Sequence, residues 1–267
     1  MKISAESIWG DLVRIRESAP LVHNITNYVV MNPTANALLA LGASPVMAHA
    51  LEEAAEMVTM AGALVVNIGT LSPPWVQGMH RAILRAKELQ IPVVLDPVGA
   101  GATPYRNRTL RELLEKGGAD IIRGNASEIQ AMVDAEATTR GVDSSAAAEE
   151  SLQAAQSLAE RESCTVCVSG AVDYIVDGAQ VYRVHNGDPL MTRVTGMGCT
   201  ASAFCGAFAA VNPHFPAAAA HAMAVMGIAG ELAMEQACGP GSLQLHFIDA
   251  VYNLNREQIA AKWQVKP

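Results

Sequence analysis

The amino-acid sequence predicts an α/β protein, a three-layer α/β/α sandwich built on a mostly parallel sheet. Short β-branched runs alternate with longer helical patterns, as in parallel strands joined by crossover helices. Residues 63–68 are apolar almost without interruption, which is typical of a parallel strand covered on both faces. A chain of 267 residues can bury a large core and shows no linker or repeat, so we expect residues 1–267 to form a single domain.

Five runs in the first half of the chain have the composition of these parallel strands, and helix-like segments separate them. They are residues 21–24, 44–47, 63–68, 92–95 and 120–122. The next segment, residues 135–162, is rich in Ala, Glu, Ser and Gln. This composition predicts a loop followed by an amphipathic surface helix with a structural role.

Three more strand-like runs follow, and they predict an antiparallel edge of the sheet. They are residues 164–168, 173–176 and 180–185, with Asp177 and Gly178 favouring a two-residue hairpin turn between the last two. From Gly198 onward the pattern is helical, over residues 199–211, 216–237 and 242–262. The middle helix is apolar on almost every side, so we expect it to be buried.

The composition is apolar, with 51% hydrophobic and only 16% charged residues. So little charge is left for the surface that we expect other copies of the chain to cover part of it. The net charge of −8 and the lack of a Lys/Arg cluster argue against a nucleic-acid partner. Charges throughout the first 20 residues exclude a signal peptide, so we expect no membrane partner, no membrane span and a cytoplasmic location.

The five cysteines are scattered along the chain and give no disulfide framework, so we expect reduced thiols. Cys164 and Cys167 have the spacing of a redox or zinc motif. They lie in a strand-like run, however, where residues three apart point to opposite faces. The spacing alone therefore gives little support to a redox or zinc site.

Residues Gly196, Met197, Gly198 and Cys199 open the first C-terminal helix and resemble an anion hole. Two glycines let the backbone approach a ligand, and the free N–H groups at a helix start attract a transferring phosphate. A thiol there is expected to have a lowered pKa and to serve as base or hydrogen-bond partner for a hydroxyl. A steric turn with a buried cysteine is the alternative, and the spacing matches neither a Walker A loop nor a full dinucleotide fingerprint.

Polar residues follow the predicted strands, at the edge where open α/β sheets bind ligands. Asp96 and Glu128 end consecutive strands and suit magnesium, which takes one or two carboxylates besides phosphate oxygens. Arg123 could pair with nucleotide phosphates, and Ser169 could contact them through its hydroxyl or backbone. Both acids also fit structural roles, because an Asp before Pro caps turns and Asn125 with Glu128 has capping-box spacing.

The N-terminal strand ends supply candidates for an acceptor substrate. Residues 23–28 and 42–47 follow or contain early strands, so they belong to the same edge of the sheet. Met47 on an apolar strand also fits a plain core position, and the seven histidines show no metal-ligand spacing.

Six blocks of sequence, taken in order, carry a resemblance to a known family. They are residues 22–27, 40–47, 67–71, 95–104, 123–128 and 194–199. Over nearly its whole length the chain resembles hydroxyethylthiazole kinases, thiamin-salvage enzymes of the ribokinase-like superfamily. The resemblance implies a ribokinase-like fold and transfer of the ATP γ-phosphate, with Mg²⁺, to the primary alcohol of 4-methyl-5-(2-hydroxyethyl)thiazole. It also implies a homotrimer with the thiazole site at a subunit interface.

The resemblance also implies roles for single residues. Met47 and Gly196 match the positions that contact the thiazole, and Arg123 and Ser169 match positions that bind ATP. Cys199 stands where most ribokinase-like enzymes have an Asp base, and a cysteine is usual in this family.

Two acidic residues complete the implied site. Asp96 and Glu128 match the positions that organise magnesium in the family. They stand beside Arg123 at the ends of consecutive predicted strands, which is the placement that the residue chemistry already favoured.

Two alternatives stay open on the sequence alone. A hydroxymethylpyrimidine kinase of the same superfamily is the nearest enzyme, and residues 23–27 with Met47 favour the thiazole enzyme over it. A non-catalytic nucleotide- or small-molecule-binding protein of the same fold is the second alternative. The retained Asp96, Arg123 and Glu128 argue against it.

Overall fold

The computed structural model describes residues 3–134 and 144–266 and, within helix α7, side chains from residue 149 onward. These residues form one mixed sheet in the order β2-β1-β3-β4-β5-β6-β7-β8-β9. The strands are β1 (Leu21–Ile25), β2 (Ser44–Val46), β3 (Ala63–Asn67), β4 (Val93–Asp96), β5 (Ile121–Asn125), β6 (Thr165–Ser169), β7 (Asp173–Asp177), β8 (Gln180–Val184) and β9 (Val265–Lys266). Strands β1 to β6 pair in parallel and β6 to β9 antiparallel, which confirms the mostly parallel sheet with an antiparallel edge.

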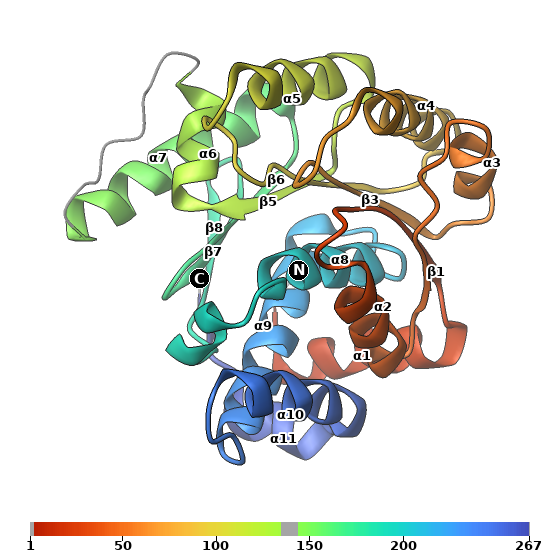
Figure 1. Ribbon diagram of the computed structural model, residues 1–267. Coiled ribbons are helices and arrows are strands. Elements are labelled where there is room, and N and C mark those ends of the chain that lie inside the picture. The colour runs from red at the N-terminus through yellow and green to blue at the C-terminus, as the bar shows by residue number, and fades with distance from the viewer. Residues whose placement is uncertain (1–2, 135–143, 267) are drawn as a thin grey trace.

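Helices cover both faces of this sheet, so the predicted α/β/α layering is confirmed (Figure 1). One layer holds α3 (Ala54–Val58), α4 (Pro73–Leu89), α5 (Pro104–Gly117), α6 (Ala126–Val133) and α7 (Ser144–Glu162). The other holds α1 (Ala5–Ser18), α2 (Met31–Leu41), α8 (Met197–Ala209) and α9 (Phe215–Met234), with α10 (Pro240–Asn253) and α11 (Arg256–Lys262) packed outside them.

The strands divide their apolar side chains between two cores. In β3, Val65 faces the α8 side while Leu64 and Val66 face the α4 side. The same alternation separates Cys164 from Cys167, which lie in different cores as buried free thiols. A shared redox or zinc site for this pair is therefore excluded by geometry, as the strand period predicted.

Helices α8 and α9 fill the core of the second layer, and their small residues allow close packing. A Cβ at Gly206 would stand 2.6 Å from a methyl carbon of Val65, so α8 approaches the sheet at a distance that only glycine permits. Among the described helices, α9 is long and apolar enough to cross a membrane, although no such segment was expected. In this protein 83% of its apolar window is buried, which confirms the predicted buried helix.

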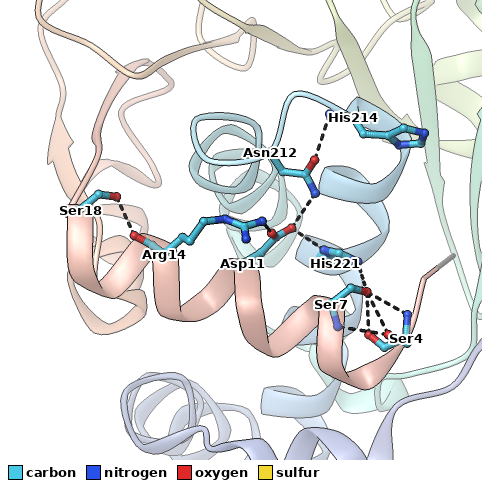
Figure 2. A network of polar contacts seen from close by, with 8 residues as sticks. All are labelled: Ser4, Ser7, Asp11, Arg14, Ser18, Asn212, His214 and His221. Atoms are coloured by element: carbon cyan, nitrogen blue, oxygen red, sulfur yellow. Dashed lines mark hydrogen bonds and ion pairs between the residues drawn. The ribbon is translucent and has the colours of Figure 1, made fainter. Parts of the chain in front are cut away.

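A buried polar network ties α1 to α9 (Figure 2). Asp11 is fully buried and accepts hydrogen bonds on one oxygen from His221 Nδ1 (2.6 Å) and Asn212 Nδ2 (2.7 Å), while Arg14 contacts its other oxygen. His221 Nε2 lies 3.1 Å from the Ser7 hydroxyl of α1. Because every partner is satisfied, the network can hold a charge in the core without an unpaired group.

Two expectations differ in detail from the structure, and two short elements were not expected. The predicted helix 242–262 is broken into α10 and α11, because Asn255 caps α11 and Gln258 completes a capping box. The hairpin turn is one residue later than expected, since Asp177 pairs with Gln180. The two-residue strand β9 and a 3₁₀ helix, η1 (Pro189–Arg193), are too short to leave a periodic pattern. The loop expected before α7 lies at residues 135–143, outside the described residues.

Candidate active site

The C-terminal ends of the parallel strands meet the N-terminus of α8 on one edge of the sheet. Asn67 ends β3, Asp96 ends β4 and Ser169 ends β6, while Cys199 lies in the first turn of α8. Because parallel strands present their carboxyl ends at the same edge, residues far apart in sequence converge there. The predicted site residues therefore occupy one edge of the sheet.

The start of α8 has the form of an anion hole. Gly196 is its N-cap with φ 88°, and a Cβ there would stand 2.9 Å from a methyl carbon of Val30, so both backbone and space require glycine. No side chain caps the terminus. The N–H groups of Met197, Gly198 and Cys199 are thus left for a ligand, and the helix dipole favours an anion.

The thiol of Cys199 is held between two amide side chains. Its Sγ accepts hydrogen bonds from Asn27 Nδ2 at 3.4 Å and Asn67 Nδ2 at 3.3 Å. Burial, reinforced by the nearby charge of Asp96, raises the pKa of Cys199 to about 11, although the two amides oppose the shift. The expected lowering of this pKa is therefore wrong, because desolvation outweighs the helix terminus. At neutral pH the group is a neutral thiol.

Asp96 is a buried carboxyl with one satisfied and one unsatisfied oxygen. Its Oδ2 accepts from Asn67 Nδ2 (2.7 Å) and from the Ser202 hydroxyl (2.8 Å), whereas its Oδ1 has no protein partner. Burial raises the pKa of Asp96 to about 6, with Arg123 and the two hydrogen bonds acting in the opposite direction. An orphaned buried acceptor of this kind requires a water or a cation.

Glu128 braces two backbone segments. Its Oε1 accepts from the N–H of Gly99 (2.9 Å) and its Oε2 from the N–H of Asn125 (2.8 Å). Asn125 Oδ1 in turn accepts from the N–H of Glu128. The capping-box alternative is thus confirmed, and the carboxylate keeps lone pairs for a further partner. In residues 3–134 and 144–266, no three His, Cys, Asp or Glu side chains form a metal cluster. Magnesium fits this donor set, since it keeps waters and takes few carboxylates.

Arg123 and Ser169 are brought together, as the sequence predicted. Arg123 Nη2 donates to the Ser169 hydroxyl at 2.6 Å, and a Cβ on Gly198 would stand 2.8 Å from Arg123 Nη1. The guanidinium is buried and its Nε has no protein partner. Burial alone would lower the pKa of Arg123, but Asp96 and other acidic neighbours raise it overall. A permanent cation therefore lies against the start of α8.

A pocket of about 480 Å³ opens beside this cation. Arg123, Ser169, Met197 and Gly198 line it together with residues that the sequence analysis did not single out. These additional lining residues include Asp173, Asn186, Asp188, Met191, Met223 and Met226. Polar side chains and methionines both line this pocket, a mixture that is typical of small-molecule sites.

Met47 lies at the far end of the same edge. It follows β2, and β2 is five strands away from β6, which carries Ser169. At about 4.8 Å per strand this separation is roughly 24 Å. Met47 and Ser169, which were predicted to bind different ligands, thus lie toward opposite ends of the edge formed by the parallel strands, and Asp96 on β4 lies between them. Gly196, the other residue predicted to contact the thiazole, lies instead at the start of α8.

Comparisons with known proteins settle the relationship of the chain. The model described as the hydroxyethylthiazole kinase family matches residues 12–257. The chain belongs to the hydroxyethylthiazole kinase family. A relative named hydroxyethylthiazole kinase, from Syntrophus aciditrophicus (strain SB), is 59% identical over 99% of this chain and 98% of its own length.

Solved structures agree with this membership of the family. The hydroxyethylthiazole kinase protein from Pyrococcus horikoshii OT3 is 46% identical, with a TM-score of 0.90 over 98% of both chains. A ribokinase-like superfamily protein from Enterococcus faecalis V583 has a TM-score of 0.63 at 12% identity, covering 94% of this chain and 90% of its own. The second likeness shows the fold alone, and it confirms the ribokinase-like architecture.

Several contact residues were missed from the sequence. Asn67 is a lone amide at the end of an apolar strand, and the rule that selected Asp96 could have selected it too. Ser202 lies within a small-residue helix, where a serine carries no signal of its own. Met223 and Met226 share a buried helix with many alanines, so their place in a pocket required the structure.

Proposed function

We propose that this protein transfers the γ-phosphate of ATP to the primary alcohol of hydroxyethylthiazole, with Mg²⁺, in thiamin salvage. The observation that carries the proposal is the uncapped N-terminus of α8, which adjoins the Arg123 cation and holds Cys199 in its first turn. Membership of the family adds the thiazole alcohol as acceptor. No finding favours the pyrimidine kinase or the non-catalytic alternative.

The nucleotide phosphates bind between Arg123 and the first turn of α8 in this proposal. Arg123 and Ser169 hold the chain of phosphates, and the N–H groups of Met197, Gly198 and Cys199 receive the transferring group. Phosphoryl transfer passes through a loose transition state, so positioning and charge stabilisation supply most of the acceleration. These preorganised donors supply both.

Two carboxyl groups would hold the magnesium ion. Asp96 offers its orphaned Oδ1 and Glu128 the remaining lone pairs of its carboxylate. When bound, the ion neutralises charge on the phosphate oxygens. Asp96 must be ionised for this task, and its pKa of about 6 leaves it so at neutral pH.

Cys199 positions the acceptor hydroxyl as a neutral thiol. Its sulfur already accepts from two amide N–H groups, so the S–H proton is the part of the group left to interact with the alcohol. A loose transition state develops little charge on the attacking oxygen early on, so a strong base is not needed. The proton of the alcohol leaves after the new phosphorus–oxygen bond has begun to form and the bond to ADP is breaking, and it passes to an oxygen of the transferred phosphate or to water.

The thiazole ring belongs at the Met47 end of the edge, with Gly196 nearer the reacting hydroxyl. Exposed apolar side chains follow β1, the strand beside β2, with Tyr28 65% and Val29 60% exposed. Such residues fit a subunit interface, and we place the thiazole site between neighbouring copies of a cytoplasmic homotrimer.

A substrate assay tests the proposed function. The purified protein is incubated with ATP, Mg²⁺ and either hydroxyethylthiazole or hydroxymethylpyrimidine, and ADP and the phosphorylated alcohol are measured. The proposal predicts a kcat/KM for the thiazole alcohol at least about 100-fold higher, a margin that several lost contacts explain. Preference for the pyrimidine would support the rival kinase, and tight binding without turnover would support a binding protein.

A further inference from the structure

Arg106 on α5 connects two loops of the active-site edge. Its Nη1 donates to the carbonyl oxygens of Ile68 and Val98, each at 2.6 Å, and its Nη2 donates to the carbonyl oxygen of Gly69 at 2.8 Å. Ile68 and Gly69 follow β3, whereas Val98 follows β4. One guanidinium therefore fastens the chain segments after two neighbouring strands.

The backbone next to this guanidinium lies close against it and supplies its hydrogen-bond acceptors. Gly99 has φ 71°, and a Cβ there would stand 3.4 Å from three atoms of the Arg106 guanidinium, so the loop lies directly against the group. Within the described residues, Arg106 forms no ion pair with a carboxylate. Its donors are directed at backbone carbonyls instead, in a fork that a lysine cannot reproduce.

The loop after β3, which Arg106 holds, is connected by hydrogen bonds to side chains of the candidate active site. The N–H of Gly69, whose carbonyl Arg106 holds, donates to Asn67 Oδ1 at 2.9 Å. Asn67 Nδ2 in turn donates to Asp96 Oδ2 at 2.7 Å and to Cys199 Sγ at 3.3 Å. The orientation of one amide thus sets the position of both the acid and the thiol.

The loop after β4 is also held by a carboxylate. Val98, held by Arg106, precedes Gly99, whose N–H donates to Glu128 Oε1 at 2.9 Å. This loop is therefore held by a cation on one side and a carboxylate on the other. Arg106 thus makes hydrogen bonds to both segments just beyond the strand ends.

We propose that Arg106 is a positioning residue for phosphoryl transfer, which acts through the Gly69 backbone and Asn67 to orient Asp96 and Cys199. The inference rests on the proposed function, because it assigns Arg106 to that reaction. A residue that only stabilises the fold would affect melting and leave the kinetics of the folded enzyme unchanged. Replacement of Arg106 should instead lower kcat and leave the KM for the thiazole alcohol largely unaltered.

The first arm of the test is kinetic. Arg106→Gln and Arg106→Lys are compared with Arg108→Gln, a change on the same helix at a side chain that is 62% exposed and 3.9 Å from Glu112. A displacement of about 1 Å at reacting groups can cost on the order of 100-fold in rate, so we expect kcat to fall about 10- to 100-fold in both Arg106 variants. Arg108→Gln should retain wild-type kcat.

A double-mutant cycle shows whether Arg106 acts through Asn67. Arg106→Gln is measured in the wild-type protein and in an Asn67→Ala background. If Arg106 orients Asn67, Arg106→Gln lowers kcat by less than about threefold further in the Asn67→Ala background, because the effects of changes within one network are not additive. Fully additive losses, or a wild-type kcat in both Arg106 variants, would overturn the proposal.

A crystal structure of each variant without ligands supplies a readout that does not depend on turnover. We expect the Gly69 N to Asn67 Oδ1 and Asn67 Nδ2 to Asp96 Oδ2 hydrogen bonds to be lost or lengthened in Arg106→Gln and unchanged in Arg108→Gln. If Arg106→Gln does not fold, Arg106→Lys takes its place. Intact bonds overturn the positioning role even if the thiazole alcohol proves not to be the substrate.

Discussion

Cys199 and Asp173 show how burial sets the chemistry of single residues in this protein. The Cys199 thiol begins a helix, a place that usually favours a thiolate, yet its pKa is raised to about 11 because little water reaches it. Asp173, which lines the pocket beside Arg123, has a pKa raised to about 6 for the same reason. Both groups favour their neutral forms more than free side chains do.

Replacement of Cys199 separates positioning from proton transfer. A general base typically contributes 10²- to 10⁴-fold, whereas we expect Cys199→Ala to lower kcat by only about 10-fold, since the alcohol loses one hydrogen-bond partner. Steady-state kinetics across pH 6 to 9 make the comparison. A loss of 1,000-fold or more would assign the proton transfer to the thiol, and an unchanged kcat would remove Cys199 from the mechanism.

Asp173 gives a prediction for stability against pH. Its folded pKa of about 6 lies above the usual value of 3.8, so the buried carboxyl costs nothing at low pH, where it is protonated in both states. The cost grows as the pH rises from about 4 to 6 and levels off above 6 at about 3 kcal/mol, at 1.36 kcal/mol per unit of difference between 3.8 and about 6. Asp173→Asn keeps the acceptor for Gly170 N and should raise the free energy of unfolding at pH 8.

Urea unfolding of the wild type and of Asp173→Asn at several pH values measures this effect. The gap between the two proteins should be widest near pH 8 and should narrow as the pH is lowered toward 4. A gap that widens on acidification would reverse the sign and contradict a buried carboxyl that resists ionisation.

Among the elements, α1 and α9 depend on one buried acid. Asp11 is fully buried and accepts hydrogen bonds from His221 and Asn212 in the core. Removing one partner of a buried charged network costs about 3–5 kcal/mol. Asp11→Ala should therefore lower the free energy of unfolding by that amount without changing the KM for ATP.

A matched surface acid is the control for Asp11. Glu6 lies on the same helix and pairs with Arg256 while 66% of its side chain is exposed, so Glu6→Ala should cost less than about 1 kcal/mol. Equal losses from the two variants, measured by thermal or urea unfolding, would show that the buried network stabilises the fold no more than a surface pair.

The elements also show which parts of the fold can be predicted from sequence. Strands such as β3 can be predicted from a continuous apolar run, and the order of strands and helices follows from where such runs occur. The division of residues 242–262 into two helices depends on Asn255, whose capping pattern competes with an uninterrupted helical period. Strand β9 exists only through its pairing with β8, which no local pattern contains.

Site residues follow the same division. Arg123, Ser169, Asp96 and Cys199 were predicted from strand ends and a glycine-rich helix start, and the structure brings them to one edge of the sheet. The side chains that surround each of these residues were not predictable, because they come from elements that are distant in the sequence. Asn67 beside the thiol is such a case, and so is the burial that raises the pKa of Cys199 against the expectation.

For the whole molecule, the low charge content and the exposed apolar residues fit the proposed assembly of several copies. Tyr28 and Val29 follow β1 at the acceptor end of the site and are 65% and 60% exposed. We expect a native mass of three chains by light scattering. Val29→Glu should weaken the assembly and raise the KM for the thiazole alcohol more than the KM for ATP. A monomeric wild type with full activity would contradict an interfacial thiazole site.

The most direct test of the account follows phosphorus itself. ³¹P NMR of a mixture of the protein, ATP, Mg²⁺ and hydroxyethylthiazole should show the γ-phosphate signal replaced by a phosphate monoester and ADP. The same mixture with Arg123→Gln should turn over at least about 100-fold more slowly, because a buried charged contact to the phosphates is gone. Release of inorganic phosphate without a monoester, or no loss of γ-phosphate, would contradict transfer to the thiazole alcohol.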